Sequence, residues 1–335
     1  MPADYREFYR GRRVLVSGGL GFIGSNLARQ LVGLDADVTL VDAMIPDYGG
    51  NRFNIAGIEE RVRVRIEDVR DERAMNAVVK DREVFFNLAG QVSHIDSMRD
   101  PYTDLDINCR AQLSMLEACR KFNQGVKVVF AGTRQVYGKP DRLPVDEHHL
   151  VRPLDVNGVN KAAGEYYHLL YNNAFGVRAC SLRLTNVYGP RQLVKHNRQG
   201  FIGWFIRLAV EGREIEVFGD GSQVRDFVYV DDAVDAFLRA GFCTTCDGDV
   251  FNVGGLEPIA HRDLAELLIE VAGTGRVRYV PWPDEKKRID IGSFYSDSSK
   301  FSRITGWKPA VDLRNGFRRT IEYYRAHLPR YVEAA

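Results

Sequence analysis

The chain has 335 residues, 45% hydrophobic and 27% charged, which is the composition of a globular protein with one large or two ordinary domains. Its 46 Lys and Arg residues nearly balance its 45 Asp and Glu residues, and the formal net charge of +1 argues against nucleic acid or an anionic membrane as a partner. The N-terminus is charged and no apolar run approaches the roughly 18 residues that span a bilayer, so we expect a cytoplasmic protein.

Short β-branched runs alternate with amphipathic stretches from residue 12 to about 184. The pattern predicts strands near 13–18, 38–42, 61–68, 83–90, 127–133 and 178–186, and helices near 24–33, 106–122 and 161–176. Such alternation is typical of βαβ units. It predicts an α/β fold in which residues 11–184 form a Rossmann-type, doubly wound parallel sheet with ligands beyond the carboxyl ends of its strands.

The pattern becomes looser after residue 185. A turn at 189–192 is followed by short strands and by helices expected near 201–212, 231–241, 261–271 and 312–327. We expect residues 185–330 to form mainly a smaller α/β cap that binds substrate. Because no repeat or Pro-rich linker separates the two parts, we expect them to interleave and pack as one unit.

A glycine-rich turn follows the first predicted strand and opens the first long helix. Gly18, Gly21 and Gly24 have G-x-x-G-x-x-G spacing, which lets the backbone approach a pyrophosphate and lets the helix pack on the strand. Asp42 ends the next strand, about 20 residues on, where a carboxylate can accept both ribose hydroxyls and would repel a 2′-phosphate. The motif predicts NAD as the cofactor.

Seven motifs together resemble the extended short-chain dehydrogenase/reductases, specifically the NAD-dependent nucleotide-sugar epimerase/dehydratase family that includes UDP-glucose 4-epimerase. They are GGLGFIG (18–24), EDVRD (67–71), NLAGQVS (87–93), VFAGTRQVYG (129–138), LRLTNVYGPRQ (182–192), FGDGSQVRDFVYVDD (218–232) and SDSSK with GWKP (near 296–309). The resemblance covers nearly the whole chain. It implies a nucleotide-diphosphate sugar as substrate and epimerisation through oxidation at the sugar C4 and re-reduction.

The resemblance also implies binding roles for matching positions. Around the cofactor these are Phe22 and Ile23 in the glycine turn, Asp68 and Val69 beside the adenine, and Leu88, Ala89 and Gly90 after the fourth strand. Asn186, Arg225 and either Lys287 or Arg288 would contact the diphosphate, and Ser93 and His94 would lie near the sugar.

The expected catalytic positions contain one departure from the family pattern. Thr133 stands four residues before the tyrosine of VYG, and Lys161 has the lysine position of the family's Tyr-x-x-x-Lys pair, but Asn157 has the tyrosine position. Residues i and i+4 share a helix face, so Asn157 and Lys161 should both face the cleft. An amide exchanges no proton near pH 7. The candidate substitutes are Lys161 itself, a water relayed between Thr133 and Asn157, and His94.

The two residues after Thr133 indicate which reaction of the family this chain could catalyse. Dehydratases and decarboxylases of this family have acidic residues there, whereas this chain has Arg134 and Gln135, which favours an epimerase. A dehydrogenase that stops at the keto-sugar and a catalytically silent NAD- and nucleotide-sugar-binding protein are the alternatives. We expect no metal, since the Cys243–Cys246 pair has no second ligand pair. Helices near 104–121 and 160–175 resemble those that the family pairs in a homodimer.

Overall fold

The computed structural model describes residues 4–284, 287 and 290–332. Seven parallel strands form the main sheet in the order β11-β6-β5-β4-β1-β2-β3. The strands are β1 Arg13–Ser17, β2 Asp37–Asp42, β3 Val62–Ile66, β4 Val84–Asn87, β5 Lys127–Thr133, β6 Ala179–Leu184 and β11 Val250–Val253. The six strands predicted from the sequence are present, and the doubly wound α/β fold is confirmed.

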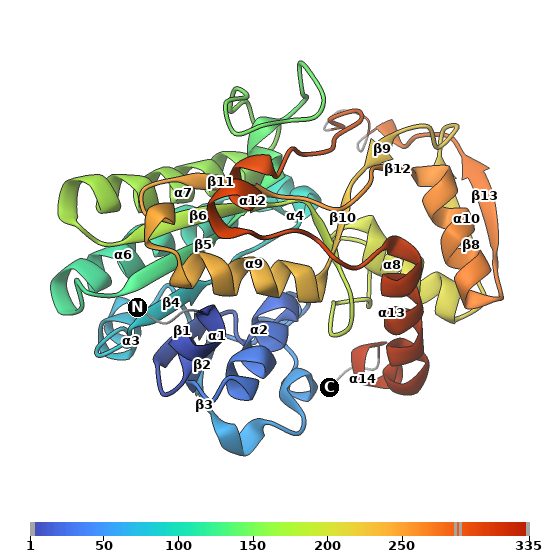
Figure 1. Cartoon of the computed structure of the whole chain (residues 1–335). Coiled ribbons are helices and arrows are strands. Elements are labelled where there is room, and N and C mark those ends of the chain that lie inside the picture. The colour runs from blue at the N-terminus through green and yellow to red at the C-terminus, as the bar shows by residue number, and fades with distance from the viewer. Residues whose placement is uncertain (1–3, 285–286, 288–289, 333–335) are drawn as a thin grey trace.

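Helices cover both faces of this sheet (Figure 1). One face packs against α1 Tyr5–Tyr9, α2 Phe22–Gly33 and α9 Val230–Phe242. The other packs against α3 Glu72–Val78, α6 Ala111–Phe122 and α7 Val156–Phe175. Both β11 and α9 come from the second half of the chain, so the two predicted parts interleave in the main sheet layer.

The remaining elements gather at one end of the molecule, on the right in Figure 1. The pairs β7 Asn186–Tyr188 with β10 Phe227–Tyr229, and β8 Glu214–Phe218 with β13 Arg276–Val280, are parallel. The pair β9 Val224–Arg225 with β12 Ile259–Ala260 is antiparallel. The helices here are α8 Phe201–Val210, α10 His261–Ala272, α13 Leu313–His327 and α14 Pro329–Val332, while α12 Ser299–Thr305 packs on β11.

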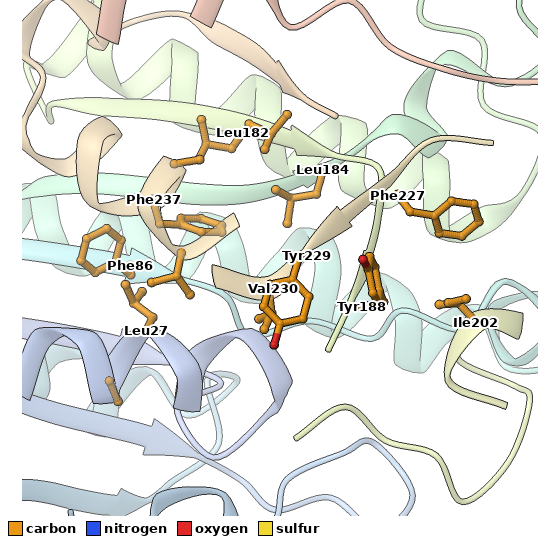
Figure 2. Close-up of a cluster of buried hydrophobic side chains, with 14 of the residues drawn as sticks. Leu27, Phe86, Leu182, Leu184, Tyr188, Ile202, Phe227, Tyr229, Val230 and Phe237 are labelled. Atoms are coloured by element: carbon orange, nitrogen blue, oxygen red, sulfur yellow. The ribbon is translucent and has the colours of Figure 1, made fainter. Parts of the chain in front are cut away.

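One hydrophobic cluster joins the sheet to this second part. Figure 2 shows Phe86 and Phe237 beside the sheet and Tyr188 and Phe227 farther along the same core. The cluster continues to Phe317 of α13. Because the two parts share one core, the cleft between them is set by packing rather than by a linker.

A broken helical segment precedes α6 at the rim of the cleft. It consists of α4 His94–Arg99, α5 Pro101–Leu105 and a π-helical turn at Asp106–Arg110. Asp100 caps α5, and Pro101 fills its first position, where the missing N–H has no cost. Short 3₁₀ turns lie at Arg52–Ile55, Glu59–Arg61, Thr244–Cys246 and, as η4, Arg134–Tyr137. Among the described residues, no helix is long and apolar enough to cross a membrane.

Candidate active site

A large cleft lies beyond the carboxyl ends of β1, β4, β5 and β6, where the chain crosses from one half of the sheet to the other. Counted to its open mouth it encloses about 1830 Å³ of empty space. Its lining includes the glycine turn after β1 and the residues that follow β4, β5 and β6.

The glycine turn at one end of the cleft is built for close backbone approach. Gly18 has a positive φ of 66°. A Cβ on Gly24 would lie 2.1 Å from the Gly18 carbonyl oxygen, so only glycine lets α2 start this close to β1. Gly21 is the N-cap of α2 and offers no side chain, which leaves the first N–H groups of the helix open to an anion. This cradle fits a dinucleotide pyrophosphate.

Asp42 stands at the end of β2 and lines the same end of the cleft. Its carboxylate accepts hydrogen bonds from the backbone N–H groups of Leu20 (3.0 Å) and Met44 (2.8 Å), which fix its orientation. Burial raises the pKa of Asp42, and these backbone hydrogen bonds act against that rise. A carboxylate has about four acceptor sites, so ribose hydroxyls can still bind.

The cleft brings together most of the residues predicted for the cofactor. Asp68 and Val69 lie in the loop after β3, and Leu88, Ala89 and Gly90 follow β4. A Cβ on Gly90 would lie 2.7 Å from Nζ of Lys161 and 2.9 Å from Oδ1 of Asn108. Residue 90 therefore has to lack a side chain so that the ammonium group of Lys161 can reach the floor of the cleft.

Lys161 lies one helical turn inside α7. Its Nζ donates a hydrogen bond to the Ala131 carbonyl (3.2 Å) and sits 5.0 Å from the centre of the Phe130 ring. Burial lowers its pKa to about 8, against the attraction of Asp104. Lys161 is therefore still mainly a cation at pH 7.

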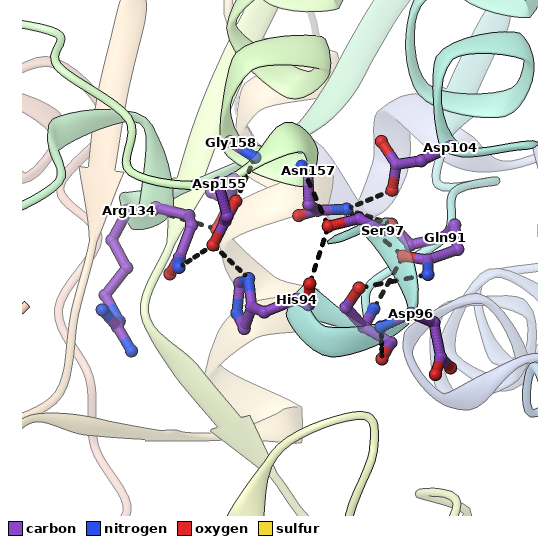
Figure 3. Close-up of polar contacts among 12 residues, drawn as sticks. Gln91, His94, Asp96, Ser97, Asp104, Arg134, Asp155, Asn157 and Gly158 are labelled. Carbon is purple, nitrogen blue, oxygen red and sulfur yellow. Dashed lines mark hydrogen bonds and ion pairs between the residues drawn. The ribbon is translucent and has the colours of Figure 1, made fainter. Parts of the chain in front are cut away.

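Asn157 also lines the cleft, but both hydrogens of its amide are committed to protein acceptors (Figure 3). Nδ2 donates to the Gln91 carbonyl (2.8 Å) and to Oδ2 of Asp104 (3.0 Å). Asn108 and Asn160 donate to the same buried carboxylate at 3.1 and 2.8 Å. The amide of Asn157 thus anchors α7 on α5, and its carbonyl oxygen is the group left to face a ligand.

The tyrosines near the site are poorly suited to act as a base. Tyr48, which lines the cleft, has a pKa raised by burial. Tyr137 donates to Oδ1 of Asn252 (2.7 Å) and accepts from Nη1 of Arg183 (2.8 Å), and burial raises its pKa to about 12. Tyr166 is more than half exposed on the outer face of α7.

Thr133 ends β5 and lines the cleft together with Arg134 and Gln135. Its Oγ1 accepts from the Gln135 N–H (3.2 Å), so its own hydrogen remains available to a ligand. In the sequence, Arg134 is notable only because it occupies a position where dehydratases of the family have an acidic residue. Its Nη2 lies 3.4 Å from Oδ1 of Asn186, its guanidinium sits over the Phe294 ring, and within the described residues its buried Nη1 has no hydrogen-bond partner.

Three residues predicted near the substrate do not line the cleft. Ser93 is buried, and its hydroxyl caps α4 by accepting from the Asp96 N–H. The guanidinium of Arg225 is buried and donates to the carbonyls of Val224 and Gly292, with Asp290 3.7 Å away. Lys287 is exposed, and Arg288 lies outside the described residues.

His94 begins α4 and lines the middle of the cleft. Its Nδ1 lies 3.0 Å from Oδ2 of Asp155, the N-cap of α7. The sequence suggested His94 but gave no sign of Asp155 as its partner. In the parts of the chain described by the structure, no cluster of His, Cys, Asp or Glu could hold a metal ion.

Known proteins share this architecture. The chain is 35% identical over 314 residues to a putative UDP-glucose 4-epimerase of Methanocaldococcus jannaschii, covering 93% of this chain and 98% of that one. It superposes on the UDP-glucose 4-epimerase of Thermotoga maritima, solved with UDP-glucose, with a TM-score of 0.86, 32% identity and coverage of 94% and 99%. For the NAD complex of the Thermus thermophilus UDP-glucose 4-epimerase the TM-score is 0.83, with 31% identity and coverage of 93% and 99%. The profile of one family matches residues 14–254, and the chain belongs to that NAD dependent epimerase/dehydratase family.

Proposed function

We propose that the protein is an NAD-dependent epimerase of a nucleotide-diphosphate sugar. The observation that supports the proposal is the cleft itself, whose lining includes both the Gly18–Gly24 turn with Asp42 and the side chains of Thr133, Lys161 and His94. Its floor holds no carboxylate at positions 134 and 135 to drive elimination.

The residues of this chain have separable tasks in that reaction. The Gly18–Gly24 turn and Asp42 would bind NAD, which supplies the hydride acceptor and donor. The cation of Lys161 would favour the negative charge that develops on the sugar oxygen. The hydroxyl of Thr133 can donate to that oxygen, and the Asn157 carbonyl can accept from a neighbouring hydroxyl.

Arg134 and Asn186 would hold the diphosphate in place of Arg225. The unpaired Nη1 of Arg134 is buried, and a charge-assisted hydrogen bond to a phosphate oxygen is strong away from solvent. The two parts of the molecule would then close on the substrate from the β5 and β6 side.

The test is incubation with UDP-, GDP-, dTDP- and CDP-sugars, with epimers followed by NMR and reduced cofactor by absorbance. We expect an epimer of at least one sugar, with no net accumulation of NADH. Accumulating NADH together with a keto-sugar would instead identify a dehydrogenase. Tight binding of a nucleotide sugar without any product would identify a silent binding protein, the alternative favoured by the committed amide of Asn157.

We also propose a homodimer formed through α5, α6 and α7. Large apolar side chains are exposed along this surface, namely Tyr102, Leu105, Phe122, Val159, Tyr166, Leu170 and Phe175. A surface of this kind is more typical of an interface than of a monomer's solvent face.

A further inference from the structure

Asp155 is a buried carboxylate at the point where α7 meets the cleft. Its side chain is 0% exposed. Oδ1 accepts from the Gly158 N–H (2.7 Å), and Oδ2 accepts from Nε2 of Gln135 (2.8 Å). Burial alone would raise its pKa, but the adjacent His94 and the hydrogen bonds from Gly158 and Gln135 lower it below the usual value. The N-terminal dipole of α7 acts in the same direction, so Asp155 is an anion at neutral pH.

The contact with Asp155 sets the orientation of the His94 ring. The His94 side chain is 35% exposed, yet Nδ1 is shielded from solvent and lies 3.0 Å from Oδ2 of Asp155, outside the alignment of a regular hydrogen bond. A carboxylate at this distance attracts a proton to Nδ1, so we infer the tautomer with Nδ1–H and a lone pair on Nε2. Because His94 lines the cleft and Nδ1 is buried against Asp155, we infer that Nε2 is the ring nitrogen available to a substrate.

His94 is also tied to the first turn of α7 through Ser97. The Ser97 hydroxyl donates to the His94 carbonyl (2.8 Å) and accepts from the Asn157 N–H (3.2 Å). Gln135 reaches the same Asp155 carboxylate from η4, directly after Thr133. Figure 3 shows the Asp155 carboxylate between these segments, beside the ring of His94. Asp155 is thus the residue that contacts the ring, while Gln135 holds the Asp155 carboxylate and Ser97 ties the backbone of His94 to the start of α7.

Other basic groups fit the role less well. Lys161 has a pKa of about 8 and is mainly protonated at pH 7, and its Nζ is directed to Ala131 and Gly90. His168 is fully buried, its Nδ1 contacts the Gly164 carbonyl (2.7 Å), and burial lowers its pKa to about 4. Neither presents a free lone pair to the cleft.

We propose that His94 is the catalytic acid and base of this enzyme and that Asp155 is its positioning residue. The inference rests on the proposed epimerase function. On oxidation, the O–H bond of the sugar hydroxyl breaks and its proton passes to Nε2 of His94, while the C–H electron pair leaves as hydride to the bound NAD and a C=O bond forms. On reduction, the hydride returns to the carbon and the imidazolium returns its proton to the oxygen. Asp155 balances the imidazolium charge between the two steps.

The experiment compares His94→Ala and Asp155→Asn with His148→Gln, a control at an exposed histidine outside the cleft. NAD content and nucleotide-sugar binding are measured beside kcat and KM. We expect His94→Ala to lower kcat about 10²- to 10⁴-fold with binding retained, which is the usual effect of losing a general base. Added imidazole should restore rate to His94→Ala and leave the wild type and His148→Gln unaffected.

Asp155→Asn should lower kcat with KM nearly unchanged, because an amide carries no charge to balance the imidazolium that forms during the reaction. Other charged groups of this region are Asp96, paired with Arg198, on α4, and Arg134 and Lys161, which line the same cleft as His94. These groups are unchanged in the variant.

An undiminished kcat in His94→Ala would overturn the inference and leave the epimerase function standing. A loss that imidazole does not restore would also overturn it and assign the effect to structure. A wild type that binds but converts no nucleotide sugar would overturn the proposed function, and this inference with it.

Discussion

Arg134 is the residue whose role changes most between sequence and structure. It stands beside Asn186 with Nη1 unsatisfied within the described residues, whereas Nη1 of Arg225 already donates to two carbonyls. A charge-assisted hydrogen bond contributes about 1.5–3 kcal/mol, so we expect Arg134→Gln to weaken binding of a nucleoside diphosphate about 10- to 100-fold. Calorimetric titration measures this, with Arg73→Gln, an exposed arginine on α3, as the control. Equal affinity in both variants would remove Arg134 from the diphosphate site.

Lys161 makes stability depend on pH. Its pKa is lowered from 10.5 to about 8, so the unfolded chain binds the proton more readily than the folded one between these values. The favourable contribution of the neutral Lys161 amine to the free energy of unfolding is therefore complete above pH 10.5 and is lost as the pH falls through about 8. A shift of this size corresponds to about 3 kcal/mol.

Urea unfolding checks this expectation. Relative to Lys161→Met, the wild type should gain about 3 kcal/mol between pH 7.5 and pH 10.5, with exposed Lys308→Met showing no such change. A difference between wild type and Lys161→Met that is constant with pH would mean that burial does not penalise this cation.

Among the secondary-structure elements, α2 allows a test of the glycine turn, because Gly24 and Gly33 both lie on this helix. Gly24→Ala would drive a methyl group into the Gly18 carbonyl, whereas nothing lies within 4 Å of a Cβ on Gly33. Overpacking typically costs 1–3 kcal/mol, so we expect Gly24→Ala to lower the midpoint of thermal unfolding and to abolish NAD retention. Gly33→Ala should retain NAD and stability. Full NAD content in Gly24→Ala would contradict the proposed cradle.

Local chemistry explains which features could be predicted from the sequence. The Gly18–Gly24 turn and Asp42 were predictable because strand, turn and helix are neighbours in the chain and the role follows from backbone geometry. The pairing of His94 with Asp155 joins residues 61 positions apart and exists because α4 packs on the start of α7. The position of Arg225 depends on the Gly292 carbonyl from a later segment, so its occupied fork was not visible in its motif.

At the scale of the whole molecule, the apolar surface on α7 predicts the oligomeric state. Tyr166 and Leu170 are one helical turn apart and both about half exposed. We expect a Tyr166→Glu, Leu170→Glu double variant to be monomeric in light scattering where the wild type is a dimer, because buried carboxylates would face each other. Leu256→Glu, at an equally exposed leucine elsewhere, should remain dimeric. A monomeric wild type would contradict the proposed dimer interface.

The position of β11 affects how the chain folds during synthesis and how a shorter fragment of it would behave. The edge strand next to β6 is formed by Val250–Val253. The ribosome must therefore synthesise the chain well past residue 253 before the main sheet can be completed. A fragment ending near residue 185 would expose β6 as an unpaired edge, a template for aggregation. We therefore expect residues 11–184 to need the later part of the chain to fold into a stable sheet.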